Sequence, residues 1–247
     1  MTESKPKNND QVALVVKYFL DNYPLELFSD TEYTPKDKKE ELAGKYLTRI
    51  TEVFRVFDRL CRYEKYFSDF YPSEETGISE AEAVEYHLTN YVQEFYILRE
   101  RIRKLVEHLK KDLEHYDIAN TEEIKQALNH IQKNIDDGFK KINDELRREH
   151  VHEMSILDLD LTRSRFFHLL ISGEIPVPEG TNLDMDRVKS LYKSTIGTSK
   201  GKHTQQAAHN SSELKRVKQS VAARFGYIFS RLNGHEDIEF DMNTGFK

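Results

Sequence analysis

The chain has 247 residues, with 37 Lys and Arg against 43 Asp and Glu, and a net charge of −6. Apolar residues are 38% of the chain and charged residues 32%, a balance typical of elongated helical proteins. The low counts of Gly (10) and Pro (6) argue against an all-β fold, which needs frequent turns. The single Cys61 excludes an internal disulfide. No apolar leader or membrane-length run is present, so we expect a cytoplasmic protein without a membrane partner.

Apolar spacing predicts helices through the first half of the chain. The first covers Val12–Phe28, and the second runs from about Lys36 to Tyr71 after the helix-start pair Thr34-Pro35. A third should begin at Ser79, because Ser79 and Glu82 form a capping box. Apolar residues then recur at steps of four and three as far as Leu113, which predicts a long helix at about 79–115.

A second long helix is predicted at about 121–148. It follows another capping box, Asn120–Glu123, and carries apolar residues from Ile124 to Leu146 on one face. Two long amphipathic helices joined by a short turn should lie antiparallel and share a four-helix core with the two preceding stretches. The sequence therefore predicts an all-α antiparallel bundle with two long helices and a smaller C-terminal helical segment.

The C-terminal part has a different character. Ile175–Gly180 contains two prolines and predicts an extended connection, and Gly197–Gly201 predicts a mobile loop. Helices are expected at Leu183–Ile196 and at Glu213–Leu232, the second capped by Asn210, with a loose tail from Gly234. We therefore expect a bundle at 1–172 and a basic helical extension at 173–247.

Charge is unevenly distributed along the chain. From Arg187 to Arg224 there are nine basic residues against one acid, Glu213, a net charge of +8, whereas residues 1–186 carry −12. Such a segment can bind a polyanion or dock on an acidic protein surface, and the charge pattern favours neither. If the polyanion is RNA, the candidate contacts are five cations: Lys200, Lys202, Lys215, Arg216 and Lys218.

The stretch Arg147-Arg-Glu-His-Val-His-Glu153 ends the second long helix and crowds two cations, two imidazoles and two carboxylates together. Charged helix ends are common, so a purely structural interpretation stays open. A chemical interpretation is RNA cleavage, in which His152 transfers a proton near neutral pH and Arg147 holds phosphate oxygens. On an unbroken helix Arg148, rather than Arg147, shares a face with His152, so either arginine can be the phosphate ligand.

Arg147, four residues and then His152 resemble the Arg-x(4–6)-His signature of the HEPN superfamily, and Val151-His-Glu153 is similar to the ending often found there. The detailed resemblance covers Asn120–Glu153. One departure is Arg148, because a small polar residue usually follows the first arginine in the family. The resemblance implies a metal-independent endoribonuclease without a cofactor, in which Arg148, Glu149, His150 and Glu153 support Arg147 and His152.

The resemblance also implies partners. HEPN ribonucleases generally place two copies of the motif across a dimer cleft, so a homodimer is expected, and a defence or toxin–antitoxin role with an antitoxin or other protein partner is implied. The rival hypothesis is a non-catalytic helical interaction or nucleotide-binding protein of HEPN-like fold. A metal site at His150 and His152, with Asp158 and Asp160 nearby, lacks a completing ligand set, so no metal is expected.

Overall fold

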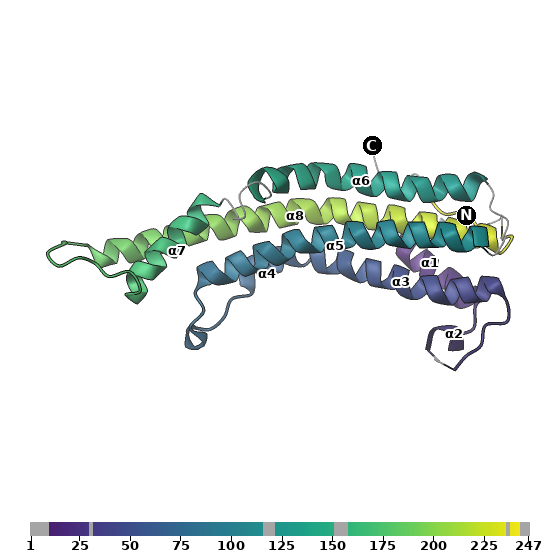
Figure 1. The fold of residues 1–247 in the computed structure, drawn as a ribbon, viewed down its shortest axis with the longest axis horizontal. Coiled ribbons are helices and arrows are strands. Elements are labelled where there is room, and N and C mark those ends of the chain that lie inside the picture. The colour runs from purple at the N-terminus through teal and green to yellow at the C-terminus, as the bar shows by residue number, and fades with distance from the viewer. Residues whose placement is uncertain (1–9, 30–31, 116–121, 151–157, 236–237, 243–247) are drawn as a thin grey trace, which may run out of the picture. The chain divides into compact units, whose positions relative to one another are not determined.

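A computed structural model describes residues 10–29, 32–115, 122–150, 158–235 and 238–242; at 74, 138 and 141–150 it describes the backbone alone. These residues form eight α-helices and one short 3₁₀ helix, with no β-strand among them (Figure 1). The helices are α1 (Gln11–Asn22), α2 (Glu26–Ser29), α3 (Lys38–Leu60), α4 (Tyr63–Asp69), α5 (Glu80–His115), α6 (Glu122–His150), α7 (Leu159–Ser172) and α8 (Met185–Leu232); η1 spans Glu74–Thr76. The predicted all-α bundle with two long helices is confirmed.

The chain divides into two compact units that interleave along the sequence. Unit 1 comprises residues 1–57, 97–139 and 213–247, and unit 2 comprises residues 58–96 and 140–212. The long helices α3, α5, α6 and α8 each contribute a segment to both units. The sequence predicts consecutive segments instead, 1–172 and 173–247, and that division stays a prediction.

Unit 1 is a bundle in which segments of α3, α5, α6 and α8 run side by side, with α1 against them (Figure 1). Its core is aromatic: Phe19, Phe57, Phe139, Phe225 and Phe229 are each at most 1% exposed. Phe19 and Phe229 place their ring centroids 4.9 Å apart, which joins α1 to α8. The C-terminal helix is therefore a member of the core, which the predicted four-helix arrangement did not include.

The C-terminal tail of unit 1 is packed rather than loose. Phe240 is 7% exposed and lies on Gly226 of α8, where a side chain would have no room because its Cβ would stand 2.2 Å from the Phe240 ring. The backbone amide of Asp241 donates to Oε1 of Gln11 at 3.2 Å. The expectation of a loose tail from Gly234 is wrong for residues 238–242, because a glycine on α8 opens space for an aromatic ring.

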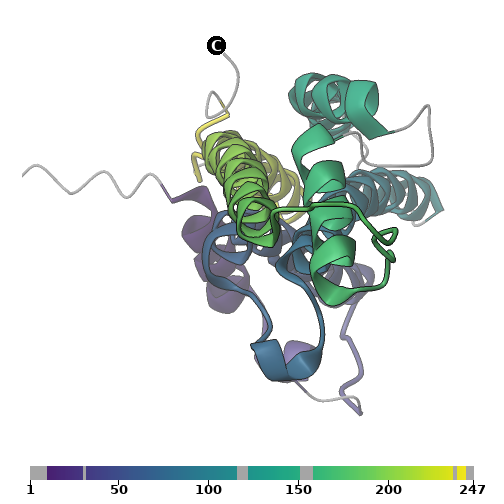
Figure 2. The same ribbon diagram turned by 90° about the vertical axis from the view of Figure 1, so that its left-hand side faces the viewer.

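Unit 2 contains α4, the first part of α5, α7 and the first part of α8, with α7 beside α8 (Figure 2). The predicted helix 36–71 is broken at Cys61 and Arg62, and after the break Tyr63 and Phe67 pack against Tyr91 at ring distances of 4.8 and 5.9 Å. Ser79 and Glu82 form the predicted capping box: Glu82 N donates to Ser79 Oγ at 3.2 Å, and Ser79 N donates to a Glu82 carboxylate oxygen at 2.8 Å. The second predicted box, at Asn120–Glu123, falls partly outside the described residues.

The C-terminal region differs most from the sequence-based prediction. Residues 175–180 contain no helix, as expected, but α8 then runs unbroken for 48 residues from Met185 to Leu232. The predicted loop at Gly197–Gly201 and the predicted cap at Asn210 are therefore wrong. Each segment has one buried polar residue bonded to a group outside α8: Ser199 donates to Asp158, and Asn210 donates to Tyr91. These contacts compensate for poor helix propensity.

Candidate functional site

The Arg-x4-His motif lies at the end of α6. The helix includes Arg147, Arg148, Glu149 and His150, whose side chains are outside the described part of the chain, as are His152 and Glu153 entirely. The helix continues two residues past Arg148, so Arg147 and Arg148 differ by about 100° around its axis. Whether either arginine meets His152 stays a prediction.

The cations proposed to contact RNA all lie on α8, but several have partners within the protein. Lys200 places its ammonium 3.7 Å from the centroid of the Tyr71 ring and 3.6 Å from Glu80 Oε2. Arg216 forms a 2.5 Å ion pair with Glu213. Lys218 lies 5.5 Å from the centroid of the Phe54 ring. Lys202 and Lys215 are exposed.

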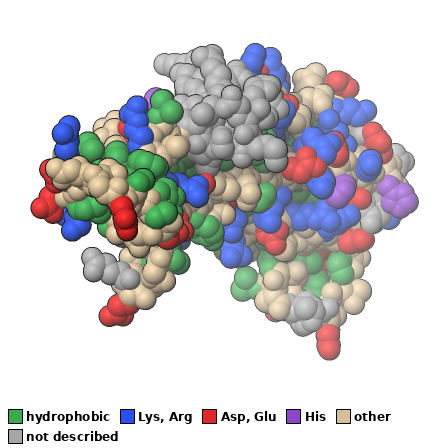
Figure 3. Space-filling view, turned by 60° about the vertical axis from the view of Figure 1, so that its left-hand side comes forward, with side chains coloured by type: hydrophobic (Ala, Val, Ile, Leu, Met, Phe, Trp, Pro, Cys, Tyr) green, Lys and Arg blue, Asp and Glu red, His purple; other side chains and the backbone are tan. Residues whose placement is uncertain are grey.

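These cations do not share one face of the helix. At about 100° per residue, Lys200 and Lys202 lie about 160° apart around α8, measured the shorter way round. Arg216 is likewise about 100° from Lys215 and about 160° from Lys218. On the face visible in Figure 3, Lys and Arg side chains are interspersed among Asp and Glu. The fold therefore does not gather the five residues into a single basic stripe.

Lys200 does line a pocket in unit 2. The cavity has a volume of about 670 Å³ and lies between the start of α5, α7 and α8. Its wall includes the rings of His168 and Tyr192, whose centroids are 5.9 Å apart, and the ammonium of Lys193. Gly197 opens the pocket, since a Cβ there would meet no atom within 4 Å. Two lysines and one carboxylate, Glu80, line the pocket beside the rings, which suits an anionic ligand with a planar ring.

A buried polar cluster next to this region was not predicted. Asp158 caps α7, where its Oδ1 accepts from the amides of Asp160 and Leu161 at 2.9 and 3.1 Å. Its Oδ2 accepts from Ser199 Oγ at 2.8 Å and pairs with Nε2 of His203 at 2.7 Å. The side chains of Asp158 and His203 are only 4% and 5% exposed. The cluster thus fixes the start of α7 against α8.

The ionisation of Asp158 follows from these contacts. Burial opposes the charged carboxylate, but hydrogen bonds from His203, Ser199 and the Leu161 amide outweigh burial and hold the pKa of Asp158 well below its usual range. Both of its oxygens have protein partners, so the metal-ligand role weighed for Asp158 is not favoured.

The three residues Ser199, His203 and Asp158 do not form a nucleophilic relay. Ser199 and His203 both bind the same carboxylate oxygen, whereas a catalytic triad places the imidazole between serine and carboxylate. The sequence indicates Asp158 as a helix cap, because an apolar run follows it. Its partners Ser199 and His203 lie more than 40 residues further along the chain. Their proximity could not be found from spacing.

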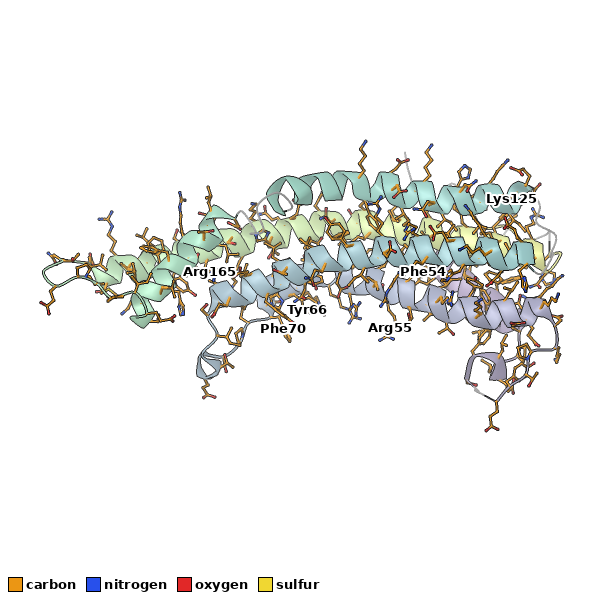
Figure 4. All side chains as sticks on the ribbon, viewed as in Figure 1. Phe54, Arg55, Tyr66, Phe70, Lys125 and Arg165 are labelled. Carbon is orange, nitrogen blue, oxygen red and sulfur yellow. The ribbon has the colours of Figure 1, made fainter. Side chains whose placement is uncertain are left out.

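The aromatic residues of α4 divide between core and surface. Helical spacing predicts core packing rather than base stacking for five residues, Tyr63, Tyr66, Phe67, Phe70 and Tyr71. Of these, Tyr63 and Phe67 are buried. Phe70 is 68% exposed and lies beside Tyr66, at a ring distance of 5.8 Å (Figure 4). The core assignment is therefore wrong for Phe70.

Comparisons with protein-family models, curated proteins and solved structures found no match to this chain. Within the described ranges, no helix is long and apolar enough to cross a membrane. The same residues contain no group of three His, Cys, Asp or Glu side chains placed to hold a metal ion.

Proposed function

We propose that the chain is an HEPN-like, metal-independent endoribonuclease in which Arg147 and His152 are the catalytic pair. The observation that supports the proposal is the position of the motif. Helix α6 is 29 residues long and places Arg147, Arg148 and His150 in its last turn, within an all-α bundle. This is the setting in which the resembled superfamily carries its Arg-x(4–6)-His signature.

The chemistry needs few groups. Attack of a ribose 2′-hydroxyl on the adjacent phosphate requires a base for the hydroxyl proton, an acid for the leaving 5′-oxygen and positive charge on the non-bridging oxygens. His152 serves as a proton carrier, and a guanidinium at Arg147 or Arg148 holds the phosphate. In a homodimer, the partner copy supplies the second proton carrier, which makes the dimer cleft the active site.

The test is incubation of the purified chain with mixed RNA in EDTA, with products analysed for 2′,3′-cyclic phosphate ends. We expect His152→Ala to lower cleavage about 10²–10⁴-fold, the usual contribution of a general acid or base. His130→Ala is the matched control, because His130 is an exposed histidine on the same helix. Undiminished cleavage by His152→Ala, with an unchanged circular dichroism spectrum, would show that the assignment is wrong.

The same cleavage assay distinguishes the roles of Arg147 and Arg148. If Arg147 is the phosphate ligand, Arg147→Ala abolishes cleavage and Arg148→Ala retains most of it, and the reverse holds if Arg148 is the ligand. Equal and small effects of both substitutions would contradict a phosphate-binding arginine at this site.

A second candidate function, nucleotide binding without catalysis, is favoured by the pocket around Lys200. Its volume of about 670 Å³ lies within the range of small-molecule sites, and its lining combines Tyr192 and His168 with Lys193 and with Lys200, which pairs with Glu80 of the same wall at 3.6 Å. A nucleobase would stack on the rings, and a phosphate would bind the lysines.

Two glycines of α8 make this candidate testable. Gly197 lines the pocket and Gly201 lies outside it, and a Cβ at either meets no atom within 4 Å. We expect calorimetry with AMP to show binding that Gly197→Leu weakens at least tenfold and Gly201→Leu preserves. No heat of binding at millimolar AMP, or equal effects of the two substitutions, would exclude the pocket as a nucleotide site.

A further inference from the structure

A groove between α3 and α5 in unit 1 gathers positive charge that the sequence did not assign to any function. The hollow has a volume of about 170 Å³, with Val53 and Leu105 among its lining residues. Its charged and polar lining consists of Arg49 and Glu52 from α3 and Arg101, Lys104 and His108 from α5. Three permanent cations therefore surround the hollow against one carboxylate.

The spacing on α5 explains the cluster. Arg101, Lys104 and His108 stand at positions i, i+3 and i+7, which lie on one face of a helix. Arg49 comes from the facing helix α3, and its Nη1 lies 2.9 Å from Nδ1 of His108. Because a guanidinium can only donate, Nδ1 is the acceptor, and Nε2 of the neutral ring carries the proton. His108 is thereby set to donate a hydrogen bond from Nε2.

Arg101, the arginine that α5 contributes to this groove, is paired differently from its neighbours on α5. Arg99 donates to Asp136 at 2.9 Å, and Arg103 donates to Glu100 and Glu107 at 2.6 and 2.7 Å. By contrast, Nη1 of Arg101 is 3.9 Å from Oε2 of Glu52, longer than a hydrogen bond. The donors of Arg101 thus have capacity for an added anion, whereas Arg99 and Arg103 are already engaged by carboxylates.

We propose that this groove binds a phosphate group of an RNA backbone, with Arg101 as its principal ligand and Arg49, Lys104 and His108 around it. The guanidinium fork of Arg101 matches two phosphate oxygens, and Lys104, whose Nζ also lies 3.4 Å from Oε1 of Glu100, adds positive charge beside it. The identity of the polyanion as RNA rests on the proposed ribonuclease function. The groove lies on α3 and α5, apart from the α8 cations that the sequence indicated, and it would hold substrate outside the catalytic motif.

The test measures binding separately from cleavage. The probe is a fluorescent single-stranded 2′-O-methyl RNA, which lacks the attacking hydroxyl, and its affinity for the full chain is measured by anisotropy across salt concentrations. We expect Arg101→Gln to weaken binding at low salt and to reduce the slope of log Kd against log salt concentration by about 0.7, the value for one phosphate contact on a single strand.

Arg103→Gln is the matched control. Its side chain is 44% exposed against 45% for Arg101, and it stands two residues away on the same helix, outside the groove. We expect Arg103→Gln to leave both affinity and slope unchanged. Arg49→Gln should weaken binding as well, because it removes a cation of the groove and the donor that orients His108.

Equal effects of Arg101→Gln and Arg103→Gln on RNA affinity and salt slope would overturn the proposal that this groove binds RNA. Absence of RNA binding by the unmodified chain would overturn it as well. The outcome for catalysis is separate. If the 2′-O-methyl RNA binds through Arg101 but unmodified RNA is not cleaved, the proposed RNA-binding role of the groove is supported and the ribonuclease proposal is wrong. If unmodified RNA is cleaved while Arg101→Gln leaves the salt slope of RNA binding unchanged, the ribonuclease proposal is supported and the groove is not an RNA-binding site.

Discussion

Two stretches of helix α8 bury their inner faces in different ways. In unit 1 the buried positions of one row along the helix are Leu214, Val217, Val221, Phe225 and Ile228, all apolar, and the polar residues Ser220, Arg224 and Ser230 are buried outside that row. In unit 2 they are Ile196, Ser199, His203, Ala207 and Asn210, at the same steps of three and four. The row in the second part of α8 is thus purely apolar, whereas the matching row in the first part mixes small, polar and apolar side chains.

The difference shows what each kind of face needs. An apolar face gains free energy against any apolar neighbour, so it is recognisable from its own sequence. A polar face is stable only when each group finds its partner, as Ser199 and His203 find Asp158, and as Asn210 donates to the Tyr91 hydroxyl at 3.1 Å. The first part of α8 therefore specifies which elements pack on it.

The largest expected loss of folding stability comes from truncating an apolar core residue of α8 in unit 1. Phe229→Ala removes a side chain of zero exposure that contacts Phe19, and core truncations of this kind cost about 3–5 kcal/mol. Urea denaturation measures the loss, which should be the same at pH 5 and pH 8 because no ionisable group is removed. A cost below about 1 kcal/mol would show that this core is not closely packed.

A smaller effect is expected in the polar stretch, and it should depend on pH. Asp158→Asn removes the charged acceptor shared by Ser199 and His203, at a cost of about 2–3 kcal/mol near neutral pH.

The sign of the pH dependence follows from the lowered pKa of Asp158, in which hydrogen bonds, chiefly from His203, outweigh the opposing effect of burial. Its stabilisation is complete above the unfolded value of about 3.9 and is lost as pH falls through the lower folded pKa. In denaturation series, the difference in free energy of unfolding between the unmodified chain and Asp158→Asn should narrow as the pH falls below about 4. A gap that widens in acid would contradict an ionised, hydrogen-bonded Asp158.

The smallest effect concerns the helical state of residues 197–201. Gly201 is exposed, and a Cβ there meets no atom within 4 Å. In a helix, Gly201→Ala should therefore raise the free energy of unfolding by about 0.5–1 kcal/mol, because alanine has the better helix propensity. Thermal unfolding measures the change. A mobile loop, the sequence-based expectation for this segment, would show no stabilisation.

Much of the fold could be predicted from patterns within single segments. The start of α5 followed from the Ser79 and Glu82 capping box, and the two long helices followed from their apolar steps. The same procedure failed at Gly197–Gly201, because two glycines and several polar residues indicated a loop. Local propensity is a weak signal where distant partners satisfy the buried groups.

For the candidate sites, the sequence supplied residue types but not their neighbours. It indicated Arg147 and His152 from their order, and it grouped Lys200 with Lys218 because both lie in one basic segment. It did not indicate the groove of Arg49 and Arg101, since those residues are 52 positions apart and come from helices with mixed charge. Charge along the chain does not predict charge on a surface when a helix turns successive side chains to different sides.

The sequence alone determined the helical class, the two long amphipathic helices and the position of Arg147 and Arg148 near the end of α6, because these depend on the order of neighbouring residues. Only the tertiary structure decided that α8 is continuous, that Asp158 joins α7 to it, and that α3 and α5 form a basic groove. Those features depend on contacts between residues far apart in the chain, which form when folding brings their helices together.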